Sequence, residues 1–361
     1  MANKKILEFC LAHGLGGLEM FVANCYEDFS HKTSCEVIVQ KDSKLDKYLE
    51  NGKKFYMKRS KFFPLLPALK LARYIDAHAI DIIHFHWNKD SITVVLAKVL
   101  SKRKPKIVQS RHMGMTRFKN DIFHRFIYKN IDMIHAVTDE VKKQLERFIP
   151  QEVRPKVQRI YLGVEENKID KERVEILRKE YGLAESFVVG IVGRIEKGKG
   201  QYKVLEAVSM LKEMDVKVVV VGSFMSEGYE RELRKLTQDL GIASKVIFTG
   251  FTKEVHEHIK LFDVNVLATE NETFGLVVIE AMINQVPMIA TNRGGPLEII
   301  DDGVDGLLFD GTSEDLAQKI ELYYKDKTLV EKIQKNALKK VQEKFNKTKQ
   351  LGKLYESITK I

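Results

Sequence analysis

ATENETFGLVVIEAM, residues 268–282, is the segment that says most about the fold of this chain. The residues before it, 264–268, are typical of a short apolar strand, and residues 276–283 are typical of a helix that is apolar nearly all round. The N-terminus of a buried helix offers free N–H groups and about half a positive charge. The segment therefore predicts an anion site, most simply for a phosphate, close to Glu272 and Glu280.

The same order of strand, turn and helix recurs along the chain. We expect strands in the first half at 5–12, 35–40, 55–57, 81–87, 106–112, 131–137 and 157–164. In the second half we expect them at 187–192, 216–221, 246–249, 264–268, 287–290 and 307–309. Strands that alternate with helices predict an α/β fold with parallel, doubly wound sheets.

Length, charge and cysteines limit the class of protein. A chain of 361 residues is long enough for two cores, and residues 162–175 resemble a hinge between them. Residues 1–165 carry 30 Lys and Arg against 18 Asp and Glu, whereas residues 166–361 carry 30 against 32. Three closely spaced cysteines are a poor disulfide framework, and no apolar run reaches the ~20 residues of a membrane helix. We expect a cytoplasmic protein without a signal peptide.

A glycine-rich turn, HGLGGLE at 13–19, follows the first expected strand. Strand, glycine turn and helix form the layout of a phosphate loop, although a merely tight turn is the alternative. The dinucleotide fingerprint G-x-G-x-x-G fails because Glu19 stands where the last glycine belongs. A nicotinamide cofactor is therefore not expected.

Basic and aromatic residues alternate in KKFYMKRSKFFPLLP, residues 53–67. Such a stretch can lie on an anionic membrane, where each Lys or Arg contributes about 1 kcal/mol. The run KRKPK at 102–106 adds to the same character. A solvated loop over a helix is the alternative, so a peripheral membrane location stays an open prediction.

Histidines raise the question of a metal. His84 and His86 share one face of an expected strand, but no third ligand stands nearby in the sequence, and His256-Glu257-His258 is expected on the solvated face of a polar helix. The chain has no Asp-x-Asp triplet either, so we expect no metal. His112 ends a strand where ligands of open α/β sheets bind, which favours a chemical role over a structural one.

Arg194 and Lys199 stand in GRIEKGKG, residues 193–200, just after an expected strand. Arg offers a planar fork of donors and Lys a point charge, and the glycines let a ligand approach. Each charge-assisted bond is worth roughly 1.5–3 kcal/mol, which is enough to stabilise a departing diphosphate without a metal. A solvated charged turn is the alternative.

Four motifs together resemble a retaining glycosyltransferase of the family 4 type. They are Gly16-Gly17-x-Glu19, Gly193-Arg194 with Lys199-Gly200, Glu272-x7-Glu280 around Phe274-Gly275, and Gly294-Gly295-Pro296-Leu297-Glu298. The resemblance spans essentially the whole chain and implies the GT-B fold, in which two Rossmann-like doubly wound domains face each other across a cleft. The implied domains are 1–165, binding the acceptor and completed by a C-terminal helix at about 342–361, and 166–341, binding the nucleotide sugar.

The resemblance also implies a role for each matching position. Arg194 and Lys199 would hold the donor diphosphate, and Glu272 and His112 would lie beside the transferred sugar. Glu280 would bind the ribose hydroxyls. The remaining donor-binding positions are backbone ones: Gly16 and Gly17 at the diphosphate, Phe274, Gly275 and Leu276 at its distal phosphate or the sugar, and the backbone near Phe251 at the base. Met113 and Leu162 depart from residues found in many relatives.

The resulting hypothesis is a metal-independent hexosyltransferase that uses a nucleotide-diphosphate sugar, UDP rather than GDP. The acceptor would be a glycan or a lipid-linked molecule of surface polysaccharide or lipopolysaccharide synthesis, and no nucleic acid is expected. A glycosidase is disfavoured because Glu280 lies about two turns beyond Glu272 in an apolar helix. A two-lobed nucleotide-sugar isomerase or epimerase and a non-catalytic binder of sugar nucleotides remain alternatives.

Overall fold

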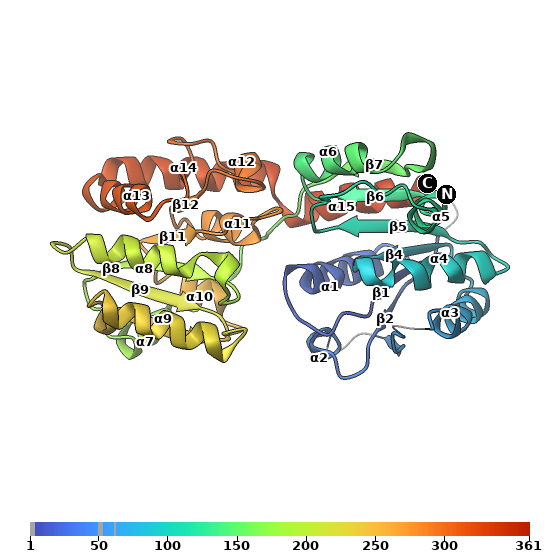
Figure 1. The fold of residues 1–361 in the computed structure, drawn as a ribbon, viewed down its shortest axis with the longest axis horizontal. Helices are drawn as coiled ribbons and strands as arrows, with labels where there is room; N and C mark the ends of the chain where they lie inside the picture. Colours follow the sequence, from blue (N-terminus) through green and yellow to red (C-terminus); the bar gives the residue numbers. More distant parts are fainter. Residues whose placement is uncertain (1–3, 50–52, 61–62) are drawn as a thin grey trace. The chain divides into compact units, whose positions relative to one another are not determined.

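Two parallel β-sheets organise the chain (Figure 1). The computed structural model describes residues 4–49, 53–60 and 63–361. Unit 1 comprises Met1–Leu162 and Thr348–Ile361, and unit 2 comprises Gly163–Lys347, where we had expected the chain to change domain at about 165 and to return at about 342. The expected α/β class is confirmed, because the strands named below, all within the described residues, pair with their neighbours in parallel.

The sheet of unit 1 has the order β3-β2-β1-β4-β5-β6-β7. Its strands are β1 Ile6–Cys10, β2 Cys35–Val39, β3 Lys54–Tyr56, β4 Ile82–Phe85, β5 Lys106–Arg111, β6 Met133–Ala136 and β7 Lys156–Arg159. Its helices are α1 Gly17–Ser30, α2 Lys44–Tyr48, α3 Leu65–His78, η1 Asn88–Asp90, α4 Ser91–Leu100, α5 Ile122–Asn130, α6 Asp139–Phe148 and η2 Gln151–Val153. Strand order reverses between β1 and β4, which makes the carboxyl ends of these strands the place for a ligand.

The sheet of unit 2 has the order β10-β9-β8-β11-β12-β13. Its strands are β8 Phe187–Val192, β9 Val216–Val221, β10 Val246–Gly250, β11 Val264–Leu267, β12 Met288–Thr291 and β13 Leu307–Phe309. Its helices are α7 Lys171–Glu180, η3 Lys197–Lys199, α8 Gln201–Met210, α9 Glu227–Asp239, η4 Ala243–Lys245, α10 Val255–Ile259, α11 Leu276–Ile283, α12 Pro296–Ile299, α13 Ser313–Lys325 and α14 Lys327–Lys344. Here the order reverses between β8 and β11.

The amphipathic pattern of residues 314–361 predicts one helical stretch, and the structure forms three helices there, α13, α14 and α15 (Lys347–Thr359). Asp326 separates α13 from α14, and its side chain accepts a hydrogen bond from Leu329 N at 2.9 Å. The last helix, α15, packs on unit 1, where Tyr355 lies 5.5 Å from Phe29 between ring centroids. Within the described ranges, no helix is both long and apolar enough to cross a bilayer.

Candidate active site

Three loops of unit 2 meet beside the point where its strand order reverses. They follow β8, β11 and β12, which are neighbours in the sheet. The first two loops are joined by hydrogen bonds: Thr269 Oγ1 donates to Gly198 O at 3.0 Å, and Glu270 N donates to the same oxygen at 3.3 Å. A Cβ at position 200 would lie 2.1 Å from Ala268 O, so the close approach requires Gly200.

The loop after β12 packs on the segment that precedes α11. Gly295 N donates to Glu272 O at 2.9 Å. A Cβ on Gly294 would lie 2.4 Å from Glu272 O, and one on Gly295 would lie 2.4 Å from Phe274 O. This packing role of the two glycines had not been predicted, although two adjacent glycines just after a strand are a signal of close backbone approach.

Lys199 and Glu272 meet at the junction of these loops. Lys199 Nζ lies 3.0 Å from Glu272 Oε2, with 26% and 19% of the two side chains exposed. Both side chains are therefore ordered but reachable by a ligand. Arg194 belongs to the same loop as Lys199 but is 60% exposed and pairs with Glu196 at 3.0 Å instead.

Helix α11 begins where the sequence predicted it, at Leu276. Gly275 precedes it with φ +95°, a left-handed conformation that favours glycine, and no side chain caps the helix. Phe274 is buried beneath this turn. The first N–H groups of the helix have no partner within it, so the predicted anion site has the expected backbone geometry.

Glu280 lies one turn into α11 and is partly buried. Loss of hydration raises the pKa of its carboxyl to about 7. No hydrogen bond or ion pair joins this carboxyl to a side chain in the part of the chain that the structure describes. A half-buried carboxylate without a side-chain donor is suited to a ligand that brings hydroxyl groups.

Phe251 follows β10 and is 62% exposed. Glycines bring the ends of β8, β9 and β10 together, since a Cβ on Gly222 would lie 1.9 Å from Gly193 O, and Gly222 N donates to Gly250 O at 3.0 Å. The loop that carries Phe251 therefore starts beside the loop that carries Arg194, because Gly222 at the end of β9 contacts both Gly250 and Gly193.

In unit 1 the glycine turn leads directly into α1. Gly16 N donates to Glu19 Oε2 at 2.9 Å, so the N–H of Gly16 is satisfied by the protein. The expectation that Gly16 and Gly17 close over the diphosphate stays a prediction. In this structure Gly17 begins the helix, and Gly16 is engaged by Glu19.

His112 lies directly after β5, and its ring contacts Phe21 of α1 with 5.1 Å between centroids. Its Nε2 is buried and has no partner among the described residues. Burial lowers the pKa of His112 well below its usual value, and the neighbouring His86 ring lowers it further. The ring is therefore neutral at physiological pH.

Asp90 is a buried residue at the same edge of the sheet that sequence reasoning missed. Its Oδ2 accepts a hydrogen bond from Leu11 N at 2.9 Å, while Oδ1 is buried without a partner in the described ranges. Burial raises the pKa of Asp90 to about 7. The signal in the sequence was weak, because an Asp just after a strand commonly caps a helix.

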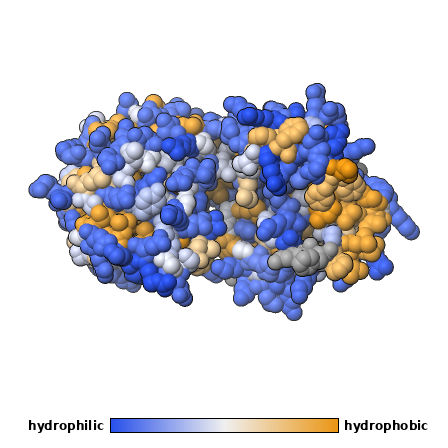
Figure 2. Space-filling view, viewed as in Figure 1, coloured by the Kyte–Doolittle hydropathy of each residue, from blue (hydrophilic) through white to orange (hydrophobic). Residues whose placement is uncertain are grey.

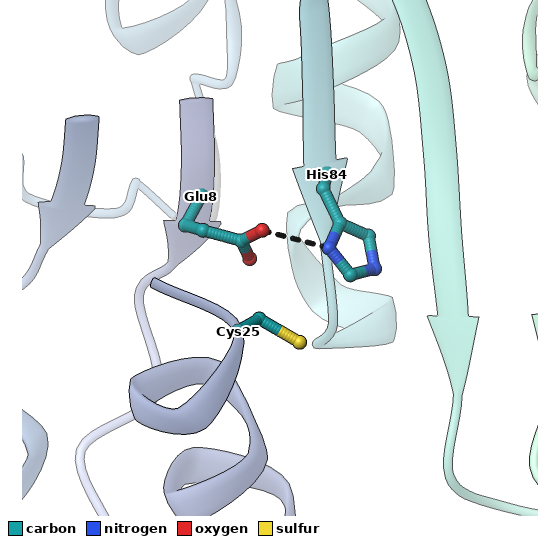
Figure 3. A group of neighbouring side chains, drawn as sticks. All are labelled: Glu8, Cys25 and His84. Atoms are coloured by element: carbon teal, nitrogen blue, oxygen red, sulfur yellow. Dashed lines mark hydrogen bonds and ion pairs between the residues drawn. The ribbon is translucent and has the colours of Figure 1, made fainter. Parts of the chain in front are cut away.

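A buried hydrogen-bonded chain runs across the sheet of unit 1, and Figure 3 shows its link between Glu8 and His84. Glu8 contacts His84 Nδ1 at 2.9 Å and His86 Nε2 at 2.7 Å. His84 Nε2 contacts Ser110 Oγ at 2.7 Å, and Ser110 Oγ contacts His135 Nδ1 at 2.7 Å. The sequence placed His84 and His86 on one face correctly but did not reveal Glu8 as their partner.

The donors in this chain can be assigned from its end. His135 Nε2 donates to Ile160 O at 2.7 Å, and burial lowers the pKa of His135 to about 3, so its neutral ring accepts from Ser110. Ser110 then accepts from His84 Nε2. Burial alone would raise the pKa of Glu8, but the two histidines outweigh it and lower the value. The contact of His84 Nδ1 with the Glu8 carboxylate continues this chain to β1.

Cys25 of α1 points toward the Glu8–His84 pair (Figure 3), so three potential metal ligands lie together. Both ring nitrogens of His84 are engaged, Nδ1 with Glu8 and Nε2 with Ser110, and burial raises the pKa of the Cys25 thiol well above its usual value. In this structure Glu8 and His84 belong to a hydrogen-bonded network, and the expectation that the protein needs no metal stays a prediction. Cys10, Cys25 and Cys35 are all free thiols.

The prediction for residues 256–258 was wrong for one histidine. His258 is 2% exposed; its Nδ1 donates to Glu254 O at 2.7 Å, and Tyr181 Oη lies 3.0 Å from its Nε2. It is a satisfied core residue of α10 rather than part of a solvated face. The helix packs one side against α7, which the polar sequence concealed.

Sequence models of two glycosyltransferase groups match the two halves of the chain. The model described as glycosyl transferases group 1 matches residues 173–340, and that described as glycosyltransferase family 4 matches residues 15–168. The chain belongs to the GT-B glycosyltransferases of the family 4 type. The fold and the family expected from the sequence are therefore confirmed, and so is a transferase activity.

Relatives and solved structures agree with this assignment. The chain is 29% identical over 307 residues to N-acetyl-alpha-D-glucosaminyl L-malate synthase of Bacillus anthracis, covering 82% of this chain and 78% of that protein. It is 31% identical over 193 residues to the capsular polysaccharide biosynthesis glycosyltransferase CapM of Staphylococcus aureus, covering 51% and 49%. The crystal structure of Anabaena Alr3699/HepE in complex with UDP and glucose superposes with a TM-score of 0.87 at 22% identity, covering 99% and 100%.

Proposed function

We propose that this glycosyltransferase moves a hexose from a UDP-sugar to a glycan or a lipid-linked acceptor in surface polysaccharide or lipopolysaccharide synthesis, with retention of the anomeric configuration. The observation that carries the proposal is the Lys199–Glu272 pair, held at 3.0 Å where the strand order of unit 2 reverses. A cation and a carboxylate beside an uncapped helix start suit a diphosphate joined to a sugar. The UDP and glucose bound to HepE and the capsular role of CapM are consistent with this choice.

Each part of the donor has a candidate partner in unit 2. Lys199 and Arg194 provide the positive charge for the diphosphate, and the N–H groups at Gly275 and Leu276 add backbone donors. Glu280 supplies an acceptor for the ribose hydroxyls, and Glu272 one for the sugar. The loop with Phe251 would meet the base, while Gly17 and His112 of unit 1 would contribute at the diphosphate and the sugar.

In the reaction proposed, the acceptor hydroxyl attacks C1 of the sugar from the face that the diphosphate leaves. The bond between C1 and the diphosphate oxygen breaks, the bond between C1 and the acceptor oxygen forms, and the hydroxyl proton passes to the departing diphosphate. Lys199 and Arg194 stabilise the charge that develops on that leaving group. The chain's own cations perform this task in our proposal, so no metal is required.

A donor assay distinguishes the proposal from its alternatives. The full chain is incubated with a UDP-hexose alone, and with the same donor plus a bacterial lipid and glycan extract, and UDP release and the sugar product are measured. We expect UDP release that depends on the extract. A changed sugar nucleotide without any acceptor would indicate an isomerase or epimerase, and tight binding without turnover would indicate a non-catalytic binder.

A further inference from the structure

Helices α3, α4 and α5 of unit 1 carry apolar side chains on the side that faces solvent. Helix α3 packs on α4, and α4 packs on α5, so the three form one layer on the sheet. In Figure 2 apolar residues gather over the region of these helices. We call this layer's outer surface the α3–α5 face. Its exposed large apolar residues are Phe63, Leu65, Leu66, Val99, Leu100, Phe118, Ile122, Phe123 and Phe126.

Helix α5 shows how unusual this surface is. It already buries Ile127 and Tyr128 against unit 1, yet Ile122 is 88% exposed and Phe123 is 52% exposed. A helix that packs on one side normally turns polar residues outward. Contiguous apolar side chains that remain in water mark a surface that another partner covers.

The charge around the α3–α5 face is predominantly positive. Residues 51–75 contain seven Lys and Arg and residues 91–120 contain eight, with no Asp or Glu in either range. Asp76 lies in α3 and Asp121 directly before α5, and some of the cations are paired: Lys98 and Lys106 with Asp132, and Arg103 with Asp81. Lys70 and Arg73 of α3 are exposed, and neither forms an ion pair with a carboxylate of the described residues. A partner for this surface must therefore be apolar at its centre and anionic around it.

A groove next to the start of α3 also combines basic and apolar side chains. It has a volume of about 770 Å³, and its lining includes Tyr56, Lys58, Leu66, Lys70 and Tyr74. The groove combines aromatic walls with basic side chains, which suits a phosphate attached to an apolar body. The basic and aromatic stretch 53–67 provides much of this lining, while Lys61 and Phe62 of that stretch lie outside the described residues.

We propose that the α3–α5 face docks on an anionic lipid bilayer. Apolar side chains enter the interface between headgroups and acyl chains, and the surrounding lysines and arginines meet lipid phosphates. A second copy of this chain fits less well, because it would bring two basic rims together. The proposal adds the apolar surfaces of α4 and α5 to the membrane contact that the sequence indicated at 53–67 and 102–106.

Vesicle sedimentation with the full chain tests the proposal. We expect binding to vesicles of phosphatidylcholine and phosphatidylglycerol, weakening as salt is raised, and little binding to phosphatidylcholine alone. The double variant Ile122→Ser with Phe123→Ser should lose about tenfold or more in partition, as should Lys70→Glu with Arg73→Glu. All four side chains are exposed, so the thermal midpoint should stay unchanged and serves as the check on folding.

Matched variants in unit 2 provide the controls. Met225→Ser with Val304→Ser removes exposed apolar residues, and Lys332→Glu with Lys335→Glu reverses exposed charges, without touching the α3–α5 face. Both should bind like the wild type. Wild-type protein that ignores anionic vesicles, or α3–α5 variants that bind as well as the controls, would overturn the proposal. If the wild type forms a dimer and the double variant Ile122→Ser with Phe123→Ser is monomeric, the α3–α5 face binds a second copy of the chain and the proposal is overturned. The assay measures binding without sugar transfer, so its failure leaves the proposed function standing.

Discussion

Lys199 and Glu272 are 73 positions apart in the chain, yet Lys199 Nζ lies 3.0 Å from Glu272 Oε2. The pair connects the loop after β8 with the loop after β11. A diphosphate that binds beside it would share the Lys199 cation with Glu272, so that the carboxylate both orients the lysine and faces the sugar.

Replacing Lys199 with alanine should lower the turnover of a nucleotide-sugar donor by about 10- to 100-fold, because one charge-assisted bond to the leaving group is lost. Lys197→Ala is the matched control, since Lys197 is exposed on the same loop. Steady-state rates of UDP release compare the two variants. Equal rates for Lys199→Ala and Lys197→Ala would remove Lys199 from the mechanism.

Glu280 should make nucleotide binding depend on pH near neutrality. Its pKa is raised to about 7, and the carboxylate form accepts ribose hydroxyls more strongly than the carboxylic acid does. UDP affinity measured by calorimetry should therefore rise as pH increases from 6 to 8. Glu280→Gln should flatten this part of the profile, and a 2′-deoxy nucleotide should show a smaller rise. An unchanged profile in the variant would contradict the ribose role.

Gly295→Ala should disturb the loop that packs on the start of α11. The added Cβ would lie 2.4 Å from Phe274 O, a backbone atom that cannot move independently. We expect the free energy of unfolding to fall by about 1–3 kcal/mol, as in other overpacked sites, and UDP binding to weaken. Gly228→Ala, at an exposed position with no atom within 4 Å of the added Cβ, should be tolerated. Chemical denaturation and calorimetry measure the two effects.

Asp90→Asn should stabilise the protein increasingly as pH rises. The folded-state pKa of Asp90 is raised to about 7, so the folded protein binds more protons than the unfolded one, and stability is lost as pH increases from about 4 through 7. The substitution removes this loss. The difference in unfolding free energy between variant and wild type should grow by about 2–4 kcal/mol from pH 5 to pH 8. Glu27→Gln, at an exposed position on α1, should give a flat difference.

The sequence predicted elements well where one local pattern determines them. Helix α11 and the strands β8, β9 and β13 have the predicted bounds, because largely apolar runs are flanked by glycine and polar residues. The division of the C-terminal stretch into three helices was missed. Asp326 marks the start of α14, because its side chain caps that helix. This single residue stands within a long stretch of helical periodicity, so the break between the helices was not recognised.

Contacts between residues far apart in the sequence could not be predicted from the sequence alone. Alternation placed His84 and His86 on one strand face, but only the strand order puts β1, and with it Glu8, beside β4. In the same way, the exposure of Ile122 contradicts the expectation that an apolar helix residue is buried. Both features depend on which elements become neighbours, and that is a property of the tertiary fold.

A thermal-shift comparison of UDP, GDP and ADP on the wild type and on Lys199→Ala tests the central claim most directly. A ligand at ~100 times its dissociation constant adds about 2.7 kcal/mol to the stability of the protein that binds it. We predict that UDP raises the thermal midpoint of the wild type more than GDP or ADP does, and that Lys199→Ala loses most of this rise. No shift with any of the three nucleotides, or an equal UDP shift in both proteins, would contradict the account.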